Sequence, residues 1–192
     1  MAITKSNLIN YLIKKIDWTE NRNYERILRR MKIHDLSALF AFFNPSIFGF
    51  SGNNIDKYLG IYNEDFYEET GLNPIGLKFG RYVRRPDVLF FKSKNEITLN
   101  DILLQKEGLD CGKSPKMYAG IIEVKPNGRD VSKIIEQLDI YSDILIKLGF
   151  YTTNISLYAL MYKIGNGGIT LKKRKKMSKL KRKKNVPLER YI

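Results

Sequence analysis

Two apolar runs in the middle of the chain constrain the fold more than any other feature of the sequence. The first run is residues 88 to 91 (VLFF), and the second lies within residues 118 to 125 (YAGIIEVK). Short, continuous apolar runs bounded by turn residues are typical of strands that are buried on both faces. A sheet of such strands needs helices on each side, so the sequence predicts an α/β domain with a central sheet.

Helical periodicity before and between the strands completes the expected order of elements. Apolar residues at helical spacing predict one helix over residues 6 to 16 and a second that begins near Asn21 or Asn23 and runs toward Phe43. A third helix is predicted from Asp130 to Leu148, followed by a strand over residues 155 to 164 and a short extension over 169 to 171. The core is therefore expected to be a mixed β-sheet flanked by helices, in the order α-β-β-β-α-β.

The chain shows neither an internal repeat nor a linker that would demand two domains. We expect one domain over residues 1 to 171, with its core at about 20 to 164 and N-terminal helical and aromatic-rich elaborations. The aromatic residues between 40 and 67 favour a core position, with a dimer surface as the alternative. Residues 77 to 84 are expected to be extended, and residues 93 to 117 look like an insertion.

The positive charge of the chain is concentrated near its C-terminus. The sequence has 34 Lys and Arg against 20 Asp and Glu, a net charge of +14. Residues 172 to 184 hold ten of these basic residues and no acidic one, so residues 172 to 192 are set apart as a basic C-terminal segment. Such a cluster indicates a polyanionic partner. A membrane surface is a weaker alternative, because the segment has no apolar face beyond Met177, Leu180 and Val186.

Cysteine content and hydropathy bear on where the chain works. A single cysteine, Cys111, can form neither an internal disulfide nor a cysteine-based zinc site. No run approaches 18 apolar residues, and Asn7, Asn10 and lysines occupy the place of a signal peptide's apolar core. The expected partners therefore include no membrane, and the expected location is the cytoplasm.

Charged side chains interrupt the two apolar strands. Asp87 precedes the first run, whereas Glu123 and Lys125 lie within the second. Because side chains alternate across a strand, Glu123 and Lys125 project from one face and Val124 from the other. Burying such charges is unfavourable by several kcal/mol unless they are paired or bind a metal. Carboxylate ligands favour Mg²⁺ or Mn²⁺ over zinc, so the pattern predicts a divalent-cation site.

The pattern resembles the PD-(D/E)XK nuclease superfamily, whose namesake motif is matched by Pro86-Asp87 and Glu123-Val124-Lys125. The 35 intervening residues are long for this motif, and the expected insertion accounts for them. The resemblance implies a restriction-endonuclease-like core. It also implies that Asp87 and Glu123 hold the catalytic Mg²⁺ or Mn²⁺ and that Lys125 positions the attacking water.

Two further segments resemble members of the same superfamily. Gln137 and Tyr141 match the QxxxY motif of RecB-like nucleases, and their spacing places them on one helical face. Glu25 lies in a segment similar to the first helix of archaeal Holliday junction resolvases, which implies a third metal ligand. The iron-sulfur cluster of some RecB-like nucleases is excluded by the single cysteine. The whole chain also looks similar to nucleases of archaeal spindle-shaped viruses, which implies a viral protein acting in the host cytoplasm.

The expected activity is Mg²⁺-dependent hydrolysis of DNA phosphodiester bonds. The resemblance favours an endonuclease, with branched DNA as one substrate class, that works as a homodimer or higher homo-oligomer. The alternative is a non-catalytic nucleic-acid-binding protein that uses the basic C-terminal segment. In either case guanidinium and ammonium groups suit phosphate contacts, and the residues expected to make them are Arg81, Arg84, Arg85, Lys172, Lys173, Arg174, Lys175, Lys176, Lys181 and Arg182.

Each candidate residue also has a structural alternative. Glu25 could pair with Arg29 one helical turn away. Gln137 and Tyr141 could be a polar border and a core aromatic, and the strand that carries Glu123 and Lys125 could simply end in solvent. A structural role is expected for His34, because it is a lone histidine without a matching base or ligand set.

Overall fold

The computed structural model describes residues 3–15, 24–50, 57–62, 77–79, 82–84, 86–94, 118–128, 131–147, 150–165, 168–175 and 186–187. Nearly all of the expected insertion at 93 to 117, with Cys111, lies outside the described residues, as does most of the basic C-terminal segment.

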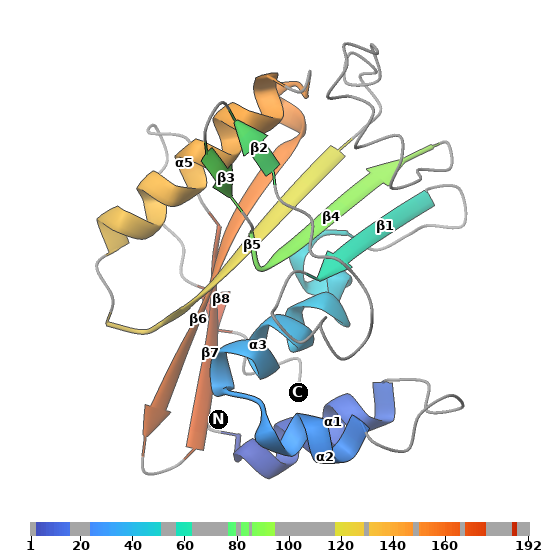
Figure 1. Ribbon diagram of the computed structural model, residues 1–192, viewed down its shortest axis with the longest axis vertical. Helices are drawn as coiled ribbons and strands as arrows, with labels where there is room; N and C mark the ends of the chain where they lie inside the picture. Colours follow the sequence, from blue (N-terminus) through green and yellow to red (C-terminus); the bar gives the residue numbers. More distant parts are fainter. Residues whose placement is uncertain are drawn as a thin grey trace.

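A six-stranded mixed sheet forms the centre of the domain (Figure 1). Its strands in spatial order are β1 (Lys57–Tyr62), β4 (Val88–Ser93), β5 (Tyr118–Pro126), β6 (Ile155–Gly165), β7 (Gly168–Lys175) and β8 (Val186–Pro187). Neighbouring strands are antiparallel except β5 and β6, which are parallel. The helix between β5 and β6 provides the crossover that a parallel pair requires.

Helices cover both faces of this sheet, which confirms the expected α/β class. One face packs against α1 (Lys5–Lys15), α2 (Tyr24–Arg30), α3 (Ile33–Phe42) and the 3₁₀ helix η1 (Pro45–Phe48), and the other packs against α5 (Val131–Lys147). A short 3₁₀ turn, η5 (Thr152–Asn154), leads into β6. Alternation along β4 shows the two layers, because Val88 and Phe90 join the first core and Leu89 and Phe91 the second. Within the described residues, the helices are too short or too polar to cross a bilayer.

The single helix predicted between about residue 21 and Phe43 was wrong, because two helices occupy this segment. The chain leaves α2 at Met31 and enters α3 at Ile33. The Asp35 side chain accepts a hydrogen bond from the Lys32 backbone N–H (3.3 Å), and the Lys32 carbonyl accepts one from the Leu36 backbone N–H (3.0 Å). Backbone N–H groups at the start of a helix have no partner within the helix, and the Asp35 carboxylate accepts a hydrogen bond from one of them. This contact favours the start of a new helix at this position.

Two strands also differ from their expected extents. Within residues 77 to 84 the structure describes two short antiparallel strands, β2 (Leu77–Phe79) and β3 (Tyr82–Arg84), which pair as a separate sheet beside α5. β7 was expected to end at Leu171, but it continues to Lys175 and pairs with β8. The first four residues of the basic C-terminal segment are therefore part of the central sheet.

Candidate active site

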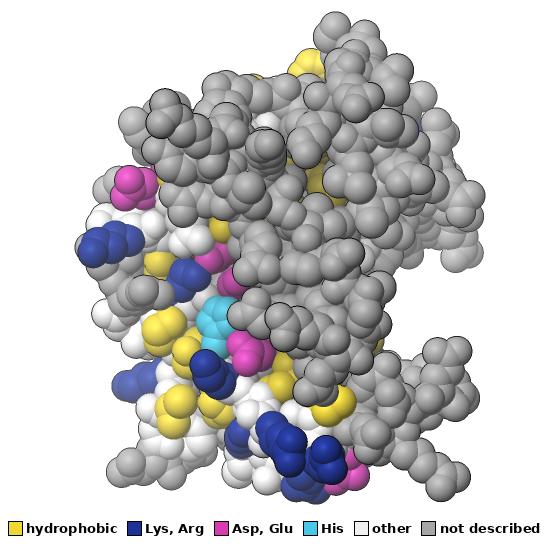
Figure 2. Space-filling view, viewed as in Figure 1, with side chains coloured by type: hydrophobic (Ala, Val, Ile, Leu, Met, Phe, Trp, Pro, Cys, Tyr) yellow, Lys and Arg dark blue, Asp and Glu magenta, His cyan; other side chains and the backbone are white. Residues whose placement is uncertain are grey.

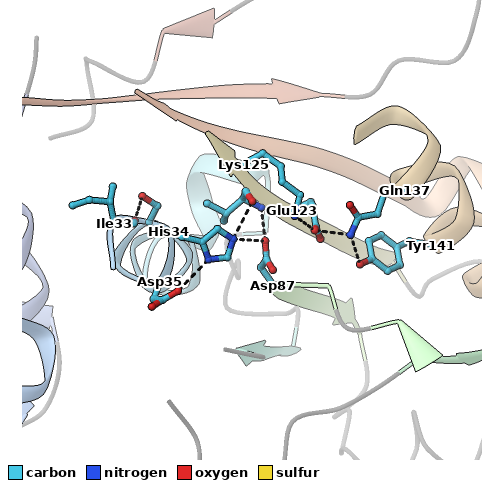
Figure 3. Close-up of polar contacts among 10 residues, drawn as sticks. Ile33, His34, Asp35, Asp87, Glu123, Lys125, Gln137 and Tyr141 are labelled. Atoms are coloured by element: carbon cyan, nitrogen blue, oxygen red, sulfur yellow. Dashed lines mark hydrogen bonds and ion pairs between the residues drawn. The ribbon is translucent and has the colours of Figure 1, made fainter. Parts of the chain in front are cut away.

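Five of the six residues expected at the catalytic site gather where β4 begins and β5 ends, on the side covered by α5 (Figure 3). Asp87 immediately precedes β4, and Glu123 and Lys125 lie in β5. Gln137 and Tyr141 reach them from α5. The arrangement follows from the antiparallel register, because Val88 pairs with Ile122 and so brings Asp87 beside the strand segment that carries Glu123.

Glu123 is the most deeply buried charged residue among those that the structure describes, with 1% of its surface exposed. Its Oε1 accepts a hydrogen bond from Lys125 Nζ and a second from Gln137 Nε2 at 2.6 Å. Its Oε2 is also buried, and no donor reaches it among the described residues. One carboxylate oxygen thus has two donors and the other has none, although buried acceptors are almost always satisfied.

The environment of Glu123 raises the pKa of its carboxyl from 4.5 to about 7. Burial is the main cause because it disfavours the charged form, and the negative charge of Asp87 adds to it. The ammonium of Lys125 acts in the opposite direction. Near neutral pH this carboxyl is therefore poised between its protonated and ionised forms.

Asp87 is fixed by the backbone of β5 and by α3. Its Oδ2 accepts a hydrogen bond from the backbone N–H of Val124 (2.5 Å) and lies 3.5 Å from His34 Nε2. Because Val124 follows Glu123, the same stretch of backbone holds both acidic residues. A carboxylate that is oriented in this way is suited to bind a ligand without first being ordered.

His34 belongs to this cluster, and the sequence interpretation assigned it only a structural role. Its Nδ1 lies 3.1 Å from Asp35 Oδ1, and its Nε2 lies 3.1 Å from the carbonyl oxygen of Val124. Both ring nitrogens face acceptors, an arrangement that suits a protonated imidazolium. The hydrogen bond from His34 is the main reason that the pKa of Asp35 is lowered. The available signal was the His-Asp pair itself, since the contact with β5 joins residues 90 positions apart.

Gln137 and Tyr141 lie on one face of α5, as their spacing predicted, and this face borders the cluster around Glu123. Gln137 Nε2 lies 3.0 Å from the Tyr141 hydroxyl oxygen as well as donating to Glu123. Tyr141 is buried, and this burial, followed by the charge of Glu123, raises the pKa of its hydroxyl. Tyr141 is therefore a neutral phenol at physiological pH, and it fills the core while its hydroxyl borders the polar cluster.

The cluster contains oxygen ligands of the kind that a hard divalent cation binds. Two carboxylates meet here, and one of their oxygens is buried without a donor among the described residues. No group of three or more His, Cys, Asp or Glu side chains in the described part of the chain is arranged to hold a metal. Mg²⁺ commonly binds through one or two carboxylates and keeps several waters, so two carboxylates are a sufficient protein contribution.

Glu25, the sixth expected catalytic residue, lies elsewhere. It is exposed on α2, and its Oε1 accepts hydrogen bonds from Arg29 Nε (3.0 Å) and Nη2 (2.5 Å). This is the i,i+4 pair that the sequence left open as an alternative. Among the described contacts, none joins Glu25 to the cluster around Glu123.

Only part of the expected phosphate-contacting set can be placed. Lys172 is exposed on β7, whereas Lys173 points inward, donates to the Ile47 carbonyl (2.5 Å) and lies over the rings of Phe48 (5.9 Å) and Tyr158 (5.7 Å). The side chains of the remaining members are not described, and these members are Arg81, Arg84, Arg85, Arg174, Lys175, Lys176, Lys181 and Arg182.

Comparison with known proteins identifies no relative. No protein-family model, curated protein or solved structure matches the chain.

Proposed function

We propose that this chain is a metal-dependent deoxyribonuclease of the PD-(D/E)XK type, which hydrolyses phosphodiester bonds in DNA. The observation that carries the proposal is the buried Glu123 carboxylate, with one oxygen left without a donor among the described residues, beside Asp87 and Lys125. The order of the elements around the central sheet also supports it, because α3, β1, β4, β5, α5 and β6 follow one another as α-β-β-β-α-β. The first of these strands is β1, within the aromatic-rich segment, and not the expected strand at residues 77 to 84, which supplies β2 and β3 of a separate sheet.

Each side chain of the cluster has a role in this proposal. Asp87 and Glu123 would hold the cation, which supplies Lewis-acid polarisation of the phosphoryl oxygen and lowers the pKa of a bound water. Lys125 holds Oε1 of Glu123 and offers positive charge to the oxygens of the phosphate as negative charge grows on them. Gln137 orients the same carboxylate, and Tyr141 stays neutral beside it.

Cleavage of a panel of DNA substrates tests the proposal. Linear duplex, single-stranded, flapped and four-way DNA are incubated with the full chain in Mg²⁺, in Mn²⁺ and in EDTA. Cleavage should require the cation, and Glu123→Gln and Asp87→Asn should each lower it by at least about 100-fold, because removing a ligand charge weakens transition-state stabilisation by several kcal/mol. Glu136→Gln and Asp143→Asn make the same changes at exposed positions of α5 and should leave cleavage unchanged.

Two outcomes would contradict the proposal. Cleavage that continues in EDTA, or in both site variants, would place the activity outside this cluster. DNA binding without cleavage of any substrate would instead favour the alternative, a non-catalytic nucleic-acid-binding protein.

A further inference from the structure

The outward face of α2 carries a row of basic side chains. Leu28 and the following Met31 are buried against the core, so the opposite side of this short helix faces solvent. Arg26, Arg29 and Arg30 are all exposed there. Their spacing of three and four residues makes Arg26 a neighbour of both other arginines on the helix surface. Arg29 is paired with Glu25, which leaves Arg26 and Arg30 as the main source of net positive charge on this face.

This basic face leads directly into the candidate active site. Lys32 is exposed and stands two residues before His34, which contacts Asp87 and the backbone of β5. Two residues of extended chain span at most about 7 Å. Figure 2 shows that dark blue side chains gather over α1 and α2, on the same face of the molecule on which the cyan side chain is visible. The basic residues of α2 and Lys32 are therefore close to the site along the chain, with Asp35 beside His34 between them.

The helix on the other side of the site has the opposite character. The exposed charged side chains of α5 include Lys133 but also Glu136, Asp139 and Asp143. A polyanion that approached over α5 would meet a net negative helix, whereas one that approached over α2 would meet a net positive surface. Among the side chains that the structure describes on these two helices, the net positive flank of the site is therefore the one on α2.

We propose that Arg26, Arg30 and Lys32 form a phosphate-binding surface that brings one strand of DNA to the site from the α2 side. The choice of DNA as the polyanion rests on the proposed function, whereas the surface itself is inferred from charge and position. The seven residues of α2 are about 10 Å long, and one strand of duplex DNA carries a phosphate about every 3.4 Å along its axis. The surface therefore matches about three consecutive phosphates.

The test compares two doubly substituted variants of the full chain that lose the same charge. One is Arg26→Gln with Arg30→Gln. The other is Lys94→Gln with Lys133→Gln, at exposed positions just after β4 and on α5. Both variants should fold, because glutamine has nearly the helix propensity of arginine and lysine and Lys94 is an exposed residue outside the helices. Binding of a short DNA duplex is measured in EDTA, where no cleavage occurs, between about 50 and 200 mM salt.

The α2 variant should bind about 10- to 50-fold more weakly near 0.1 M salt, and its plot of log affinity against log salt should be shallower by about 1.8, the loss of two phosphate contacts. Lys32→Gln, added to it, should lower the slope by about 0.9 more. The variant with Lys94→Gln and Lys133→Gln should retain the wild-type slope. Equal slopes for the two double variants, or an unchanged affinity in the α2 variant, would overturn the proposal.

Two further outcomes separate this surface from its alternatives. Phosphatidylserine vesicles should not compete with the duplex for the α2 surface. If the substitutions at Arg26 and Arg30 weaken vesicle binding more than they weaken DNA binding, the choice of DNA is overturned. Because binding is measured without the cation, the result is independent of catalysis. If the α2 variant loses affinity and the wild-type protein cleaves no substrate, the phosphate-binding surface is upheld and the proposed nuclease is refuted. If the wild-type protein cleaves DNA and the α2 variant keeps its affinity, only the surface is refuted.

Discussion

Glu123→Gln should make the metal-free protein more stable above neutral pH, although it removes a hydrogen-bonded charge. The folded-state pKa of Glu123 is about 7, against 4.5 for the group in solvent. Between these two values the folded state binds the proton more tightly than the unfolded state. The free energy of unfolding therefore falls as the pH rises through this window, because an ionised carboxylate must be kept in a buried position.

The size of the effect follows from the pKa difference. A shift of about 2.5 units corresponds to about 3 kcal/mol of unfolding free energy over the full window, and most of this falls between about pH 5 and about pH 8. Glutamine closely matches the shape of the protonated acid and can still accept from Gln137 or Lys125. The variant and the wild type should thus differ little near pH 5, and the variant should be more stable by roughly 2 to 3 kcal/mol near pH 8.

Urea unfolding in EDTA at these two pH values measures the difference. Glu136→Gln, which makes the same change at an exposed position of α5, serves as the matched control and should show no pH-dependent gain. Mg²⁺ added near pH 8 should raise the stability of the wild type and not that of Glu123→Gln, because a ligand that binds only the folded state stabilises it. A wild-type-to-variant difference that is the same at both pH values would refute the account of Glu123 as a strained, buried carboxylate.

Two other substitutions test the packing around the site. Lys173→Gln should lower stability by about 1 to 2 kcal/mol, because it removes an inward hydrogen bond and contacts with two aromatic rings, while Lys172→Gln on the exposed side of the same strand should have almost no effect in the same urea unfolding experiment. Gly120→Ala should be destabilising by about 1 to 3 kcal/mol, since its new Cβ would lie 2.3 Å from the ring of Phe50. If a second change, Phe50→Leu, removes most of this loss, the clash is its cause. An equal loss with Phe50 and with Leu at position 50 would contradict this explanation.

Local patterns in the sequence predicted most of the regular elements. Alternating and continuous apolar residues predicted β4, β5 and β6, and helical spacing predicted α1 and α5 to within a residue or two. The break between α2 and α3 was not predicted, because Lys32 is an unusual residue at a helix start and Asp35 supplies the capping contact from inside the next helix. Pattern methods follow side-chain periodicity, which this change of helix axis barely alters.

The residues of the candidate site also differ in whether the sequence predicted their positions. Glu123, Lys125, Gln137 and Tyr141 were predictable because strand alternation and i,i+4 spacing fix which of them share a face. The part played by His34 was not, since its partners Asp87 and Val124 are distant in sequence and come near only when α3 packs on the sheet. The contacts of Lys173 are likewise a product of tertiary packing, because its charge alone gave no reason to place it against Phe48 and Tyr158.

The asymmetry at Glu123 argues for a functional rather than a structural origin of this charge. A buried ion pair kept only for stability would be expected to satisfy both carboxylate oxygens, and an apolar pair of similar size is often as stable or more so. Here Lys125 and Gln137 both donate to Oε1, although Oε2 is equally inaccessible to water. Asp87 lies near enough to raise the pKa of Glu123, so the fold brings together two negative charges that repel each other. Such an arrangement is unfavourable in the isolated chain and would become favourable if the proposed cation joined the two carboxylates. The cation should therefore raise stability and enable cleavage together.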